Sequence, residues 1–520
     1  VSVSVLFDAT AKPPSGLLSG NANQYGDFDE CLSINEAVRG KYCLASLVLN
    51  LEGDENIMAI DTLIHSGHYI KSNVTDMGHR VPRFSSVLWG ICIPSSCSSF
   101  DLEHELSERL ASINVSVTVH NTMCTVKDVR RPYSFSKTLA ITFFLSVILL
   151  LSLGTILDDG TDGVTNFEKL LNAFSLKRNL RKVFDLSDSP SRVKGVDAVR
   201  GVSALALLVA HKSMAMAHNP YVNKTFFSTV FGMPWAVIGR SAIVYTDSFL
   251  YLSGFLNAHN LLQELDRKGT IDVKNKLISR WFRLFPLFLS LMLFCTYVLP
   301  DINNGPQWNL VIEEHSRVCQ KHMWKSFLFL HNYFGFEDMC LTHTHQIGLD
   351  MQLYIATLPL MLFLWKFKTI GWTLVIAIAA ASTALRYMAI YWYDIIHIFV
   401  PCFRLNHFKC YFPFFVLNYF VKCLARTILK IFPFTISGVG TSFVESRMFK
   451  FFNKIAYSVY LTQFPIFFYN VGIQRHSDFY SPFLLVSDIH FIYTYKISII
   501  FFYSLVIELL FIIVGLGYVI

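Results

Sequence analysis

The chain has 520 residues, of which 53% are hydrophobic and only 16% are charged. This composition is too apolar for a soluble protein of that size and is typical of a helical membrane protein with several spans. The formal net charge of +7 is small for the length, and no motif or basic arm indicates nucleic-acid binding. Since the sequence begins with Val and ends inside an apolar run, we expect a fragment or a processed form.

Residues 1–135 form a polar N-terminal region in which no segment is long enough to cross a bilayer. Two glycosylation sequons, at Asn73 and Asn114, accompany dense cysteines, which together indicate an oxidising, glycosylating compartment. We therefore expect a small disulfide-rich domain on the lumenal or extracellular side; the alternative is a cytosolic domain with free thiols. The odd cysteine count leaves one thiol without a partner in this domain. The cysteines are Cys31, Cys43, Cys92, Cys97 and Cys124.

The first apolar segment, residues 138–157, has twenty residues without a charge and predicts a transmembrane helix. The polar residues 158–194 follow as a linker with clustered Lys and Arg, which cytosolic loops prefer. We group residues 136–194 as the first transmembrane helix and its cytosolic linker. The clustered basic residues of the linker are Lys177, Arg178, Arg181 and Lys182.

Residues 195–520 predict a multi-pass membrane domain, because long apolar segments recur through them. The expected fold class is an all-α polytopic membrane protein of about 9–11 transmembrane helices, with a small disulfide-rich N-terminal extracellular domain. After the span within residues 195–219, the expected spans lie near residues 236–262, 281–299, 342–365, 370–391, 411–429, 449–469 and 497–520.

The helix predicted over residues 195–219 carries ionisable side chains at bilayer depth. Arg200 and His211 are eleven residues apart, which is three turns plus about 20°, so both side chains lie on one face and about 16 Å apart along the axis. Ionisable groups at this depth usually face a site inside the protein. A histidine that is satisfied by a neighbouring helix is the structural alternative. A third sequon, at Asn223, follows this helix and predicts a return to the lumenal side.

Further polar residues interrupt the next apolar segments. Asp247 and Ser253 are six residues apart and therefore lie on different sides of their helix. Arg280 and Arg283 are three apart on one face at the membrane boundary, where cytosolic anchoring and a functional role are equally consistent. Asp350 enters an otherwise apolar span.

The loop over residues 300–345, which we expect on the lumenal side, holds Cys319 and Cys340. These two cysteines are better placed for a disulfide than for a metal site. His343 and His345 alternate with threonine at the mouth of the next span and could suggest zinc. Because no third ligand follows at helical spacing, we expect no metal site.

Several phrases in the chain resemble known families. Residues 90–97, with the pattern G-x-C-x-P-S-S-C, resemble the cysteine-rich extracellular domain at the head of "nose resistant to fluoxetine" proteins of invertebrates. From residue 195 onward the chain is similar to the acyltransferase-3 family of membrane enzymes. The similar phrases are the Arg-x10-His pair of Arg200 and His211, TDSFLYLSGF from Thr246, R-x-x-R-L-x-P from Arg280, HQIGLDMQLY from His345 and FNKIAYSVYLTQFPIFF from Phe452.

The second resemblance implies transfer of an acyl group from a cytosolic donor, usually acyl-CoA, to a hydroxyl of a carbohydrate or lipid. It implies that His211 is essential, and a neutral imidazole can remove the proton of an acceptor hydroxyl. Arg200 could hold a phosphate or the developing oxyanion. Arg280 and Arg283 would suit the phosphates of CoA. Asp350 would orient an imidazole or pair with an arginine, and no metal is expected.

This sequence departs from the second family in places. Gln463 stands where the family commonly has histidine, and residues 402–442 resemble nothing in the family. We expect Asp247, Ser253 and Gln463 in the substrate pocket. The expected function is membrane O-acyltransfer; the alternatives are a carrier for lipids, sterols or hydrophobic drugs, and a catalytically inactive relative. The expected partners are membrane lipids and the acyl acceptor, in the plasma membrane or the endoplasmic reticulum.

Overall fold

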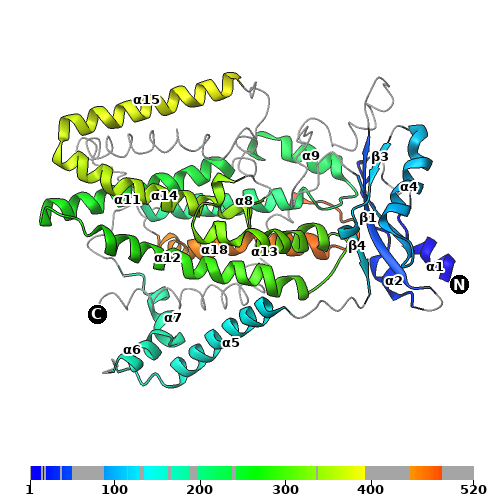
Figure 1. Ribbon diagram of the computed structural model, residues 1–520, viewed down its shortest axis with the longest axis horizontal. Coiled ribbons are helices and arrows are strands. Elements are labelled where there is room, and N and C mark those ends of the chain that lie inside the picture. Colours follow the sequence, from blue (N-terminus) through cyan, green and yellow to red (C-terminus); the bar gives the residue numbers. More distant parts are fainter. Residues whose placement is uncertain are drawn as a thin grey trace.

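A computed structural model of the chain is mostly helical, with a smaller domain at one end of a long helical bundle (Figure 1). The structure describes residues 2–482 except 13–15, 17–18, 36–37, 50–86, 114, 128–133, 162–164, 188–195, 237–241, 335–337 and 393–445. The sequons at Asn73 and Asn114 lie outside the described residues, as do the spans expected near 411–429 and 497–520 and the unusual segment 402–442.

The N-terminal domain, called the head below, is built on a four-stranded antiparallel sheet. The long strand β1 (Gly40–Leu49) pairs with β2 (Val87–Pro94) on one side and with both β3 (Val115–Thr118) and β4 (Cys124–Val126) on the other. The described part of the membrane region is helical, as expected, whereas the disulfide-bonded head contains this sheet.

Helices cover both faces of this sheet. Because neighbouring side chains on a strand point to opposite faces, Tyr42 and Leu44 of β1 pack on one face and Cys43 and Ala45 on the other. The first face is covered by α1 (Ser2–Ala9) and α2 (Phe28–Ser33), and the second by α4 (Ser99–Leu110).

Three disulfides link six of the described cysteines. Cys31 of α2 is bonded to Cys92 of β2, and Cys43 of β1 is bonded to Cys124 of β4. Cys97 is free, so the expectation of one unpaired cysteine in the head is confirmed. Beyond the head, Cys319 is bonded to Cys340, as predicted.

Three helical segments among the described residues are long and apolar enough to cross a membrane, by length and composition. They are Phe135–Ile156, which is α5; Val273–Asp301, which begins with α12 (Val273–Leu293); and Thr342–Lys366, which contains α14 (His345–Lys366). The remaining long helices of the bundle are α8 (Val196–Met216), α11 (Ala242–Lys268), α15 (Lys368–Trp392) and α18 (Arg447–Ile473).

Helix α8 packs against both α11 and α18, and α14 packs against α11 and α15. Gly201 marks the close contact of α8 with α18, because a β-carbon at this position would lie 2.6 Å from the ring of Phe449. The short helices α6 (Asn166–Ala173) and α7 (Leu176–Phe184) lie at the end of the bundle opposite the head (Figure 1). The bundle thus has a head end and a linker end.

The segment after α8 lies at the head end. It leads into α9 (Lys224–Gly232), where the Thr225 hydroxyl donates a hydrogen bond to the carbonyl of Ser19, at 3.1 Å. Asn223 is buried, and its amide exchanges two hydrogen bonds with the backbone of Tyr480, at 2.9 and 2.7 Å. The amide nitrogen that would carry a glycan is therefore buried and hydrogen-bonded in the folded chain. The structure does not favour the glycosylation of Asn223 that the sequon predicts.

Candidate functional site

A charged cluster lies where α11, α12 and α14 meet, with Arg280 at its centre. The Arg280 guanidinium forms an ion pair with the carboxylate of Asp350. It also donates to the Ser253 hydroxyl at 3.1 Å and to the side-chain oxygen of Asn257 at 3.3 Å. Its carbon lies 4.3 Å from the ring centroid of Tyr354, a cation–π contact. The Ser253 hydroxyl in turn donates to Asp350 at 2.6 Å.

Helical spacing explains this arrangement. Ser253 and Asn257 are four residues apart on α11, and Asp350 and Tyr354 are four apart on α14, so each pair shares one helix face. Arg280 reaches between the two faces from α12. The ion-paired side chains are only 15% and 21% exposed for Arg280 and Asp350, so water screens the pair less than it would at the surface.

Arg200 of α8 is a second cation near this cluster. Its charge interacts with those of Arg283, Asp197 and Asp350. One of its terminal nitrogens donates to the side-chain oxygen of Asn453 at 3.0 Å, and the Asn453 amide donates to Asp197. This chain of contacts ties the start of α8 to α18.

Arg283 is exposed and interacts electrostatically with both Arg280 and Asp350. The three arginines of this region face two aspartates, Asp197 and Asp350, which leaves one net positive charge. The arrangement can therefore attract and hold a phosphate-bearing group.

His211 lies at a second level of the bundle, toward the head end. The imidazole is buried and meets the ring of Phe464 edge-on, with 4.6 Å between centroids. It lies close enough to Gln463 and His345 to interact with them. Among the described residues, its Nδ1 atom has no hydrogen-bond partner. Phe464 also stacks on His343, at 4.6 Å, so aromatic and imidazole rings fill this level.

The structure brings Arg200 and Asp350 together and places His211 apart from them. Arg200 and His211 remain three turns apart on α8, as the sequence predicts. Asp350 is committed to Arg280 rather than to an imidazole. The expected substrate-pocket residues divide in the same way, since Ser253 joins the charged cluster and Gln463 lies beside His211.

Asp247 belongs to the part of α11 that lies beside the start of α14. The neighbouring carbonyl of Thr246 accepts a hydrogen bond from the Gln346 amide at 2.6 Å.

Asn257, Tyr354 and Asn453 were not expected at the site. The first two could have been found from their four-residue spacing to Ser253 and Asp350.

Within the part of the chain that the structure describes, no group of three or more His, Cys, Asp or Glu side chains could hold a metal ion. The two histidines that suggested zinc contact the backbone. His343 Nε2 lies 3.0 Å from the carbonyl of Leu461, and His345 Nδ1 lies 2.8 Å from that of Thr342.

A hollow of about 520 Å³ opens at the head end of the bundle, between the ends of α8 and α18. Polar and apolar side chains share its wall. Lys212, which follows His211 on α8, is buried at its margin. The wall also includes Met216, Asn219, Phe467 and Asn470.

These features define a helical membrane protein with a disulfide-bonded head and polar sites inside its bundle. Residues 4–106 match the family described as nose resistant-to-fluoxetine protein, N-terminal domain, and residues 193–445 match the family described as acyltransferase domain. The chain is thus a nose resistant-to-fluoxetine domain protein with an acyltransferase-3 family membrane region.

Two relatives from Caenorhabditis elegans are similar to the chain. "Nose resistant to fluoxetine protein 6" is 23% identical over 433 residues, which are 73% of this chain and 52% of the relative. "Regulator of hypoxia-inducible factor 1" is 25% identical over 231 residues, which are 42% of this chain and 43% of the relative. The chain therefore spans about half the length of these relatives. No solved structure matches it.

Proposed function

We propose that the protein is a membrane O-acyltransferase that moves an acyl group from acyl-CoA to a hydroxyl of a lipid or carbohydrate acceptor. The match of residues 193–445 to the acyltransferase domain supports the reaction class. The observation that carries the finer proposal is α8, which holds Arg200 in a net positive cluster and His211 in a buried position nearer the head.

The charged cluster suits the donor. Arg283 is exposed beside Arg280, so the phosphates of CoA can pair with guanidinium groups at this level. CoA carries its thiol at the end of a long, flexible arm. That arm can extend along α8 from the level of Arg200 toward His211, about 16 Å away along the axis.

The acceptor would arrive from the opposite end. The hollow between α8 and α18 brings a mixed polar and apolar wall to Lys212, next to His211 in the chain. An acceptor with a polar head and an apolar part fits such a wall. In this arrangement, donor and acceptor approach His211 from different ends of the bundle.

The chemical step uses His211 as the general base. The acceptor oxygen attacks the thioester carbonyl carbon, and its proton passes to the unpartnered Nδ1 of His211. The carbon–sulfur bond then breaks, the acyl group stays on the acceptor oxygen, and the CoA thiolate takes the proton from the imidazole. Gln463, beside the ring, orients it.

The test uses the purified full chain in lipid nanodiscs, incubated with radiolabelled acyl-CoA and fractionated lipid and glycan acceptors. His211→Ala is expected to reduce acyl transfer by about a hundred- to ten-thousandfold, the usual share of positioned acid–base catalysis. His259→Ala is the matched control, because His259 contacts Gln263 on α11 and lies outside both levels of the site. Full activity of His211→Ala would remove this residue from the mechanism.

The large hollow also favours one alternative, a carrier for lipids or hydrophobic small molecules. Proteoliposomes loaded with a fluorescent lipid distinguish the two functions. A carrier moves the probe without acyl-CoA and without acylating it, whereas the enzyme modifies its acceptor and requires the donor.

A further inference from the structure

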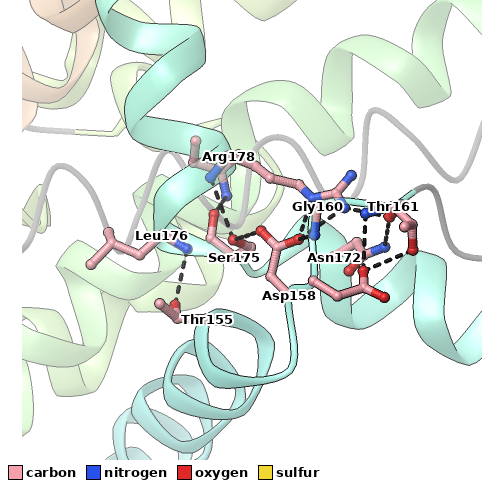
Figure 2. A network of polar contacts seen from close by, with 10 residues as sticks. Thr155, Asp158, Gly160, Thr161, Asn172, Ser175, Leu176 and Arg178 are labelled. Carbon is pink, nitrogen blue, oxygen red and sulfur yellow. Dashed lines mark hydrogen bonds and ion pairs between the residues drawn. The ribbon is translucent and has the colours of Figure 1, made fainter.

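The linker after the first span folds back onto the end of that span and is fixed there (Figure 2). Asp158, two residues after α5, accepts hydrogen bonds from the Ser175 hydroxyl and from Arg178 Nε, the latter at 2.9 Å. The Leu176 N–H donates to the Thr155 hydroxyl of α5 at 3.0 Å. The start of α7 is therefore held within about one helical turn of the end of a candidate transmembrane helix.

The outer side of α7 is both basic and apolar. Lys177, Arg181 and Phe184 are four and three residues apart, so they fall within about 60° of one another around the helix. All three are exposed, as is Lys182, and Phe184 is 56% exposed. The opposite side of the helix buries Asn179 and Val183.

Helix α6 adds two exposed apolar side chains to the same hairpin. Phe167 is 66% exposed and Leu170, three residues later, is 43% exposed. Together with Lys177, Arg181, Lys182 and Phe184, these residues are called the hairpin surface below. A water-exposed surface with this many large apolar groups needs a partner.

The charges of the hairpin surface are available to that partner. Among the described residues, Lys177, Arg181 and Lys182 have no ion-pair partner. The acidic groups of the hairpin are committed to local contacts. Glu168 completes the capping box of α6 with Thr165, Asp159 bonds Thr161, and Asp158 is paired with Arg178.

The C-terminal end of α7 is anchored to the bundle. Phe184 stacks on Phe451 of α18, with 5.5 Å between centroids. The Lys454 ammonium group donates to the carbonyls of Lys182 and Asp185, at the end of α7. The hairpin is thus a rigid part of the linker end.

We infer that the hairpin surface lies in the headgroup region of the leaflet opposite the head and binds anionic phospholipids. Amphipathic helices with Lys and Arg beside large apolar residues bury their apolar side chains at the headgroup boundary. Here the position relative to the bilayer follows from α5, because the hairpin is fixed to its end. The phosphate groups of the lipids then neutralise the three cations.

The test follows hydrogen exchange of peptides covering residues 166–184 in the full chain. One set of nanodiscs contains phosphatidylcholine alone and the other contains added phosphatidylserine. We expect slower exchange in the anionic nanodiscs, and the difference to shrink when NaCl is raised from about 0.15 to 1 M, because salt screens exposed charges. Each cation is expected to contribute about fivefold to lipid affinity.

A triple variant, Lys177→Gln, Arg181→Gln and Lys182→Gln, is expected to remove the lipid-dependent protection. The matched control removes the same charge from the helix ends that flank the connection between α11 and α12, with Arg267→Gln, Lys268→Gln and Lys274→Gln, and is expected to keep the protection. Unchanged exchange elsewhere in the chain shows that each variant is folded.

Three outcomes would overturn the inference. Equal protection in neutral and anionic nanodiscs, or protection that survives in the triple variant, would show that anionic lipid is not the partner. Protection that appears in detergent on adding soluble glycerophosphoserine alone would assign the cations to a free phosphate ligand instead of to a membrane.

Discussion

Arg280 is the residue that organises the linker-end level of the site. Its planar guanidinium contacts a carboxylate, a hydroxyl, an amide oxygen and an aromatic ring at once. A lysine ammonium group can form the ion pair but cannot reproduce this fork. We expect Arg280→Lys to weaken acyl-CoA use, seen as a raised KM for the donor with a smaller change in kcat.

The same contacts predict coupling between Arg280 and Asp350 in stability. Asp350→Asn leaves a mostly buried guanidinium without its counter-charge, and Arg280→Gln leaves the carboxylate alone. Hydrogen bonds to charged groups contribute about 1.5–3 kcal/mol each. We expect each single variant to lower the thermal midpoint in detergent and the double variant to lower it by less than the sum. Additive shifts would contradict the ion pair.

The sequence identified most of these residues singly but not their grouping. Arg200 and His211 share a helix, so helical periodicity alone fixes their spacing of three turns. Arg280 and Asp350 are on different helices, and their pairing depends on how α11, α12 and α14 rotate against one another. Periodicity holds no information on that rotation, so the sequence left open whether Asp350 orients an imidazole or pairs with an arginine, and the structure shows the arginine.

At the scale of elements, the long apolar helices could be predicted and the sheet of the head could not. Strand β1 is covered by helices on both faces, so its sequence lacks the alternation of apolar and polar residues by which a half-buried strand is recognised. Its pairing with β2 also depends on a partner far along the chain.

The Cys319–Cys340 disulfide closes a loop between α13 (Glu314–Phe327) and the start of α14. Closing a loop of this length stabilises by about 3 kcal/mol in the chain-entropy model. We expect Cys340→Ser to lower the thermal midpoint and to leave Cys319 open to alkylation after denaturation, read by intact mass. An unchanged number of alkylated thiols would contradict the bond.

The ionised carboxylate of Asp158 holds the linker against the end of α5. The hydrogen bond from Ser175, aided by Arg178, keeps the pKa of the Asp158 carboxyl below its usual value. The ionised Asp158 therefore stabilises the packing of the linker against α5 fully above the ordinary carboxyl pKa of about 4. This stabilisation is lost as the pH falls through the lowered pKa of Asp158. We expect Asp158→Asn to speed hydrogen exchange at residues 172–180 at pH 7, with wild type approaching the variant only in strong acid.

For the whole molecule, the head and the linker mark opposite ends. The head, with its two disulfides, and the segment after α8 lie at one end, and α6 and α7 lie at the other (Figure 1). In a variant without free cysteines, we expect Glu108→Cys to react with a membrane-impermeant maleimide in intact cells. Ser187→Cys should react only after permeabilisation. The reverse labelling pattern would show that the membrane topology is the opposite of the expected one.

The head is held to the bundle by contacts at several points. The Thr225 hydroxyl donates to the carbonyl of Ser19 at 3.1 Å, and the Asn309 amide donates to the Thr125 hydroxyl at 2.9 Å. Arg475, just beyond α18, pairs with Asp29 of α2 at 3.0 Å and stacks over the ring of Phe28. The head is therefore part of the rigid body rather than a loosely tethered module.

The Arg475–Asp29 pair joins residues 446 positions apart in the chain. During synthesis at about 5–20 residues per second, roughly 20 to 90 s separate the appearance of these two partners. The head can form its own sheet and both of its disulfides in that interval, and the segments that carry Thr225 and Asn309 reach it before Arg475 is made. Among these head contacts, the one that joins Asp29 to the end of α18 is therefore the last to form during synthesis.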